Sequence, residues 1–172
     1  MFKCSVQYGY DEMMALYYVL EKTKRKPSIK FTRYTLYLAG GLVLLSGVVT
    51  IPTMELSFNA FIPLLVGVGL IFMGKKYVHF TVKNSLKNIS RSLGNMNFSL
   101  EKKNYEVTDR SRRVELQYQD LADIVYYNNM WFLFRNKTRS YILPEKNFYE
   151  GDVSELADFL KLKTGITPTI LK

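Results

Sequence analysis

Cysteine and histidine are almost missing from this chain of 172 residues, which contains one of each, Cys4 and His79. A disulfide framework needs at least two cysteines, and a structural zinc site needs several cysteine or histidine ligands. A nucleophile activated by histidine would have one candidate base. We therefore expect Cys4 to be a reduced, packed thiol. We expect no metal site, no cofactor and no catalytic residues, and we predict a non-enzymatic protein.

Two further chemical signals are incomplete. Residues 69–76 (GLIFMGKK) nearly match a phosphate-binding loop, but Lys76 stands where the motif needs a serine or threonine to hold Mg²⁺. Several carboxylates fall in or beside expected turns, where such groups usually cap or solvate the backbone: Asp109, Asp120, Asp123, Glu145 and Glu150. These patterns favour a surface role over acid–base catalysis.

Charge is nearly missing from the middle of the chain. The net charge is +9, yet Glu55 is the single charged residue between positions 34 and 74. Residues 1–33 carry seven Lys or Arg against three acids, and residues 75–91 carry five with no acid. Because the positive excess flanks an uncharged block instead of covering a whole surface, we do not expect a nucleic-acid partner.

The uncharged block contains two apolar runs, residues 34–54 and 57–74. Each is close to the ~20 residues that a helix needs to cross a bilayer. Two buried helices of this length would need a much larger soluble protein around them, and a cleaved signal peptide would not follow 33 ordered-looking residues. We predict a transmembrane hairpin over residues 31–94 with a tight turn around residues 52–59.

Basic residues lie at the outer ends of both runs, whereas the turn carries Glu55 alone. They are Lys22, Lys24, Arg25, Lys26, Lys30 and Arg33 before the first run, and Lys75, Lys76, Lys83, Lys87 and Arg91 after the second. Basic residues near span ends stay on the cytoplasmic side. We therefore expect a cell-membrane protein with both termini in the cytoplasm and lipids as neighbours of the spans.

Glycines recur at a spacing of seven in each run, which places them on one helix face. In an antiparallel hairpin, facing residues have a constant sum of residue numbers, so Gly40 would face Gly74 and Gly47 would face Gly67, with the turn near Ser57. Small facing residues let helices approach closely in lipid. The alternative is that these glycines reflect only the general frequency of glycine in membrane helices.

Amphipathic segments flank the hairpin on both sides. Val78, Val82, Leu86, Ile89 and Leu93 extend the second span as a helix to about residue 93, ended by Gly94. Upstream, Asp11 can cap a helix carrying Met13, Leu16, Tyr17 and Leu20, which Pro27 would end or kink. The two apolar stripes either pack together as a stalk or lie against lipid headgroups.

From residue 95 onward the period changes to alternation, which predicts short antiparallel strands. The expected strands are 97–100, 105–109, 113–118, 123–127, 130–135 and 140–143. Asn128 and Asn129 form a good two-residue hairpin turn because asparagine tolerates positive φ. Asp152 can cap a last helix that ends near Gly165. The fold class is therefore α+β, with the hairpin attached to a small antiparallel β domain over residues 95–172.

The motifs Tyr118-Gln-Asp-Leu121-Ala-Asp-Ile124, Trp131-Phe-Leu-Phe134 and Tyr141-Ile-Leu-Pro144-Glu-Lys146-Asn-Phe148, in this layout, resemble the YcxB-like family of bacterial membrane proteins. The resemblance implies a C-terminal domain similar to pleckstrin-homology folds, with seven strands and a capping helix, and no established enzymatic activity. The C-terminal segment supplies six strands, so we expect residues 2–8, within an N-terminal segment 1–30, to join the sheet as the seventh.

Basic residues gather in the expected turns of the β domain. Lys102, Lys103, Arg135, Lys137 and Arg139 are expected at one end of the sheet, and Arg110, Arg112 and Arg113 at the other. Either set can contact anionic headgroups or a partner, although a solvated surface explains them as well.

These features predict a membrane protein that presents its β domain to a protein partner, to another copy of itself or to anionic lipid. The alternative is an immunity protein that protects its own membrane from a secreted toxin. A transporter subunit is disfavoured because neither span contains an ionisable residue.

Overall fold

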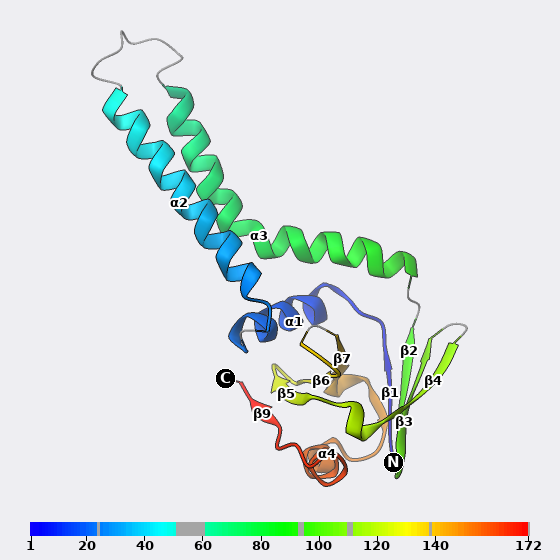
Figure 1. Ribbon diagram of the computed structural model, residues 1–172. Helices are drawn as coiled ribbons and strands as arrows, with labels where there is room; N and C mark the ends of the chain where they lie inside the picture. The colour runs from blue at the N-terminus through cyan, green and yellow to red at the C-terminus, as the bar shows by residue number, and fades with distance from the viewer. Residues whose placement is uncertain (24, 51–60, 93–94, 110–111, 138, 172) are drawn as a thin grey trace. The chain divides into compact units, whose positions relative to one another are not determined.

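A computed structural model describes residues 1–23, 25–50, 61–92, 95–109, 112–137 and 139–171. The chain divides into two compact units (Figure 1). The hairpin unit is residues 27–81, and the β unit combines residues 1–26 with 82–172. Residues 1–26 are therefore part of the β unit, although they are far from its other residues in the sequence.

The hairpin unit is built from two long apolar helices, α2 (Pro27–Thr50) and the first part of α3 (Ile62–Ser92). Both are long and apolar enough to cross a membrane, and only 11% of each apolar window is buried. Pro27 begins α2, where its missing N–H costs no helical hydrogen bond, so the expected break or kink becomes a helix start. The expected turn, with Glu55 and Ser57, lies outside the described residues.

The second helix continues well past its apolar part, as expected. α3 runs without interruption from Ile62 through Gly74 to Ser92, and it enters the β unit at Val82. Gly94, the expected end of this helix, lies outside the described residues.

The four glycines lie between the two helices, but they pair differently from the expectation. A Cβ added at Gly40 would lie 2.9 Å from the carbonyl oxygen of Gly67, and one added at Gly74 would lie 2.8 Å from the ring of Tyr37. Gly47 faces Leu64. The predicted pairs Gly40–Gly74 and Gly47–Gly67 are therefore wrong. Most glycines face a bulky side chain of the other helix, because a large residue fills the space that a missing side chain leaves.

The β unit contains two sheets where the sequence suggested one. Sheet A has the order β4-β3-β2-β1-β8 and sheet B has the order β7-β6-β5-β9. The strands of sheet A are β1 (Phe2–Val6), β2 (Met96–Leu100), β3 (Asn104–Asp109), β4 (Arg112–Gln117) and β8 (Phe148–Glu150). Those of sheet B are β5 (Asp123–Tyr127), β6 (Met130–Phe134), β7 (Ser140–Pro144) and β9 (Thr169–Ile170).

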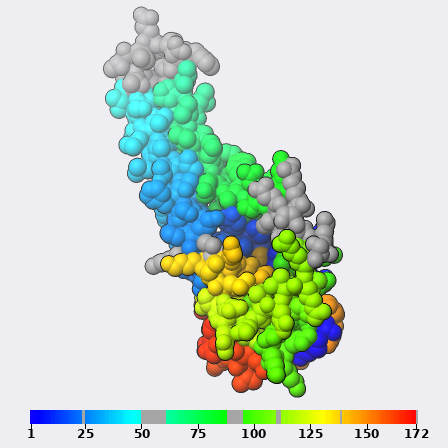
Figure 2. Space-filling view, turned by 45° about the vertical axis from the view of Figure 1, so that its right-hand side comes forward, coloured from blue at the N-terminus to red at the C-terminus, as the bar shows by residue number. Residues whose placement is uncertain are grey.

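The N-terminal strand joins the sheet, as expected. β1 pairs antiparallel with β2, with Cys4 opposite Phe98, and its other edge pairs with β8. In the space-filling view the blue N-terminal residues accordingly lie beside green and orange segments from much later in the chain (Figure 2). The strand is thus an interior member of sheet A, and the hairpin unit is inserted between two hydrogen-bonded neighbours.

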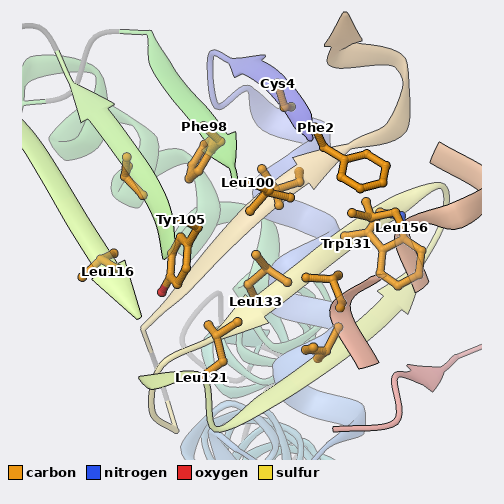
Figure 3. Close-up of a cluster of buried hydrophobic side chains, with 14 of the residues drawn as sticks. Phe2, Cys4, Phe98, Leu100, Tyr105, Leu116, Leu121, Trp131, Leu133 and Leu156 are labelled. Carbon is orange, nitrogen blue, oxygen red and sulfur yellow. The ribbon is translucent and has the colours of Figure 1, made fainter. Parts of the chain in front are cut away.

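The core lies between the two sheets and is closed by α4 (Leu156–Thr164) (Figure 3). Phe2, Phe98 and Tyr105 contribute from sheet A, Trp131 and Leu133 from sheet B. Leu156 and Leu160 of α4 are fully buried. Asp152 caps the short 3₁₀ turn Val153–Glu155 that leads into α4, and Gly165 ends the helix with φ +71°, where a Cβ would be strained.

Helix α1 (Tyr10–Lys22) covers the other face of sheet B. It contacts β5 and β7, and Met13, Tyr17 and Leu20 are buried. Phe132 and Phe134 alternate with the core residues of β6 and point to this second face, which explains why all of β6 is apolar. Gly9 occupies the N-cap in place of the expected Asp11. A hydrogen bond of 3.0 Å between the Tyr17 hydroxyl and Ser85 also joins α1 to α3.

Candidate binding site

The segment that precedes α1 is held by side-chain hydrogen bonds to β7 and the turn after it. The N–H of Ile142 donates to the Tyr8 hydroxyl at 3.2 Å. The amide of Asn147 donates to the Ser5 carbonyl at 2.8 Å. β7 is an edge strand of sheet B, so no strand lies beside it to accept the hydrogen bond of the Ile142 N–H. The Tyr8 hydroxyl is the acceptor instead.

Glu12 in the first turn of α1 is a buried carboxylate, 8% exposed. It accepts a hydrogen bond from the backbone N–H of Gly9 at 3.1 Å and forms an ion pair of 3.4 Å with Lys146. Lys146 comes from the short 3₁₀ turn η4 (Glu145–Asn147). The pair fixes the start of α1 against η4, and its two charges balance each other within the protein.

The β5–β6 turn has the two-residue geometry that the sequence predicted. Asn128 and Asn129 have φ values of +50° and +56°, between the register partners Tyr127 and Met130. Positive φ at both central positions defines a type I′ turn, which matches the twist of the strands. The Glu145 N–H donates to the carbonyl of Asn129 at 2.9 Å, so this turn and η4 are held together.

A groove of about 710 Å³ lies where α1, the β5–β6 turn and η4 meet. We call it the α1 groove. Its lining is mostly aromatic, apolar or amide: Tyr10, Asp11, Met14, Ala15, Tyr18, Tyr127, Asn128, Asn129, Met130, Pro144, Glu145 and Lys146. None of these twelve is a histidine, cysteine, serine or threonine, so the lining suits binding better than nucleophilic chemistry.

The aromatic wall of the α1 groove is ordered by ring contacts. Tyr18 stacks on Tyr127 with 4.5 Å between ring centroids and 19° between planes. The ammonium of Lys22 lies 5.3 Å from the Tyr18 centroid, a cation–π contact. This wall is therefore a preformed π surface that already attracts one cation of the chain.

Glu145 is anchored at the other end of the groove. One carboxylate oxygen accepts a hydrogen bond from the indole N–H of Trp131 at 3.3 Å. Burial, and next the nearby charge of Glu145, raise the pKa of Tyr126, whose ring lies 4.7 Å from that of Trp131. Glu145 also lines the groove.

Arg25 connects the end of α1 to the opposite end of β5. It forms an ion pair with Asp123, and its guanidinium lies 4.3 Å from the ring centroid of Phe134. Both side chains are mostly buried, 16% and 25% exposed. Because Arg25 stands two residues before the start of α2, this pair fixes the point at which the chain leaves the β unit.

The basic residues singled out from the sequence belong to different sheets. Lys102 and Lys103 are exposed between β2 and β3 in sheet A, and Lys137 and Arg139 are exposed between β6 and β7 in sheet B. Burial raises the pKa of Tyr105 at the start of β3, and the Arg135 charge opposes this, so Arg135 lies near that strand.

The β3–β4 end of sheet A is more neutral than its sequence suggests. Arg113 is paired with Glu106, and Arg112 is exposed opposite Asp109 in the strand register. Arg110 lies outside the described residues. Carboxylates of β3 therefore balance part of the positive charge of Arg112 and Arg113.

The sequence did not predict the α1 groove, although two of its signals point to it. The motif Pro144-Glu-Lys146 and two tyrosines, Tyr10 and Tyr18, supply two of its sides. Which segments would meet there depends on how α1 packs against sheet B. Cys4 is buried, and burial raises the pKa of its thiol to about 12. Within the described residues, no cluster of three or more His, Cys, Asp or Glu is placed to hold a metal ion.

Comparison with known proteins gives no relative: no family model, no curated protein and no solved structure matches this chain. The α1 groove and the two apolar helices are therefore the features of the molecule that bear on its function.

Proposed function

We propose that this is a non-enzymatic cell-membrane protein whose two-helix hairpin anchors a cytoplasmic, pleckstrin-homology-like module, and that the module binds a protein partner through the α1 groove. The groove is the observation that carries the binding part of the proposal. We also propose, from the motifs in residues 118–148, that the chain is similar to the YcxB-like family.

The membrane part is supported by exposed apolar surface. Leu38, Leu45 and Val49 of α2 are 65–71% exposed, and Leu65 and Phe72 of α3 are 65% and 55% exposed. A monomeric soluble protein rarely presents such a continuous apolar surface to water. Together with the flanking lysines and arginines, this surface favours two spans with both termini in the cytoplasm.

The pleckstrin-homology-like part is supported by strand order. β2-β3-β4 and β5-β6-β7 are two antiparallel meanders in separate sheets, and α4 contributes Leu156 and Leu160 to the core that they share. β1 completes the first sheet, giving the seven strands and capping helix that the resemblance implies, with β8 and β9 as short additions.

A protein partner is favoured over lipid at the α1 groove because of the lining. Two carboxylates, Asp11 and Glu145, line the groove against one lysine, Lys146, and carboxylates repel lipid phosphates. Anionic headgroups fit the basic turns with Lys102, Lys103, Arg135, Lys137 and Arg139 better, as a secondary contact with the bilayer.

Site-directed crosslinking in cells tests the binding part. Photoreactive p-benzoylphenylalanine at position 129, on the rim of the groove, is expected to give a protein adduct that disappears when Met14→Arg blocks the groove. The matched control is position 149, where Tyr149 is 64% exposed on β8. A lipid adduct at 129, or equal adducts at 129 and 149, would contradict a protein-binding groove.

Cysteine labelling in intact cells tests the membrane part. An impermeant maleimide is expected to label a cysteine at position 57 and not one at position 128, while the buried Cys4 contributes little background. Equal labelling of both positions would contradict the arrangement. Hydrolytic or transferase turnover by the purified protein would contradict the non-enzymatic part.

A further inference from the structure

The α1 groove carries an inference about its ligand, which rests on the proposed function of that groove. We infer that it receives a lysine or arginine side chain of the partner protein, set beside an apolar residue. The observation behind this inference is a local excess of negative charge on an aromatic wall, within a chain whose net charge is +9.

The charges around the groove do not cancel. Asp11, Glu145 and Lys146 line it. Lys146 is already matched by Glu12 behind the wall, at 3.4 Å. Among the described residues, no basic side chain lies within ion-pair distance of Asp11 or Glu145. Two carboxylates are thus left to attract a cation from outside.

The aromatic side chains favour the same ligand. Tyr10, Tyr18 and Tyr127 line the groove, and rings of this kind attract Lys and Arg through their π faces. The ammonium of Lys22 over Tyr18 is one such contact within the chain. A cation placed between these rings and the two carboxylates would gain both interactions at once.

The remaining lining suits a peptide more than a free ion. A volume of about 710 Å³ holds several residues, and Met14, Ala15, Met130 and Pro144 supply apolar contacts for a neighbouring side chain. The exposed carboxamides of Asn128 and Asn129 can hydrogen-bond a peptide backbone. Because the turn is tied to η4 through Glu145, the groove keeps its shape without a ligand.

Defined peptides and the full-length protein in zwitterionic nanodiscs test this inference. The probes are three fluorescein-labelled hexapeptides, identical except that the central residue of an alanine–leucine background is lysine, norleucine or glutamate. Fluorescence anisotropy should show the lysine peptide binding at least tenfold more tightly than the other two. The preference should shrink as salt is raised.

A double variant, Asp11→Asn with Glu145→Gln, removes the two charges and keeps an acceptor oxygen for Trp131. We expect it to weaken binding of the lysine peptide about tenfold. The matched control, Glu155→Gln with Asp158→Asn, removes the same charge from two exposed positions, in the 3₁₀ turn before α4 and in α4 itself, and should change binding less than twofold.

The outcomes separate the two proposals. Equal binding of lysine and norleucine peptides, both abolished by Met14→Arg, would overturn the cation preference and leave the groove as a peptide site. Binding of none of the peptides would overturn both. Displacement of the lysine peptide by short-chain phosphatidylglycerol would overturn the protein ligand in favour of lipid.

Discussion

The hydroxyl of Tyr8 offers a sharp test of how the N-terminal segment is attached to the β unit. Tyr8→Phe removes one oxygen atom and keeps the ring. The lost atom is the acceptor for the N–H of Ile142, a residue that is 1% exposed on the outer strand of sheet B. Burial raises the pKa of the Tyr8 hydroxyl well above its ordinary value, so it is neutral at every pH at which the protein is handled.

The expected cost follows from the donor left behind. A buried backbone N–H without an acceptor costs roughly 1–3 kcal/mol, more than the net worth of the hydrogen bond itself. Water cannot replace the acceptor easily because Ile142 is almost completely buried. We therefore expect Tyr8→Phe to lower the free energy of unfolding of the β unit by about 2 kcal/mol.

The fluorescence of Trp131 can report this loss of stability, because Trp131 is the single tryptophan and is 5% exposed in the core. Urea unfolding of the full-length protein in mild detergent, followed by its fluorescence, should show a lower midpoint with an unchanged slope. The matched control is Tyr105→Phe, whose hydroxyl is buried without a hydrogen-bond partner among the described residues and whose loss should be neutral or stabilising. Equal effects of the two variants would refute the reasoning.

Gly67→Leu should destabilise the hairpin by about 1–3 kcal/mol, because a Cβ there would lie 2.6 Å from a leucine of the other helix. The control Gly69→Leu places its side chain in open space and should be tolerated. Titration of the full-length protein with SDS, followed by the circular dichroism of its helices, compares the two variants. Cys4 should resist alkylation up to about pH 9 while folded, since its pKa is raised from 9.0 to about 12. The free energy of unfolding should therefore fall as pH rises from 9 towards 12, because only the unfolded thiol ionises there; rapid native alkylation at pH 8 would contradict this. Asp123→Asn should cost about 1–3 kcal/mol by leaving Arg25 partly buried without its carboxylate, and urea unfolding that matches the parent protein would speak against that ion pair.

The strands of the β unit were largely predictable because their signals are local. The expected strand 123–127 coincides with β5, and four other expected strands differ from the observed ones by one residue at one end. The expected strand 113–118 is shifted by one residue from β4. Alternation of apolar residues and turn residues such as Asn128 depend on neighbours in the chain. The continuation of α3 to Ser92 followed from a helical repeat in the same way.

The errors arose where distant segments must choose partners. The glycine pairing assumed that small residues face each other, whereas Gly74 faces Tyr37. The single sheet became two because β5 pairs with β6 and β9 and not with β4. The N-terminal helix was expected to pack against the extension of the second span or to lie at the headgroups. Tyr17 of α1 does bond Ser85 of α3, but α1 also covers a face of sheet B that an all-apolar β6 leaves open.

Composition and periodicity by themselves determined the two apolar helices, the strands and their turns, since each depends on residues within a few positions of one another. Only the tertiary structure decided that β1 lies inside sheet A and that α1 meets the Asn128–Asn129 turn and Glu145 to form a groove. The reason is physical. The local sequence fixes which face of a strand or helix is apolar, but the surface that this face meets is supplied by segments far away in the chain, and their packing selects among many compatible arrangements.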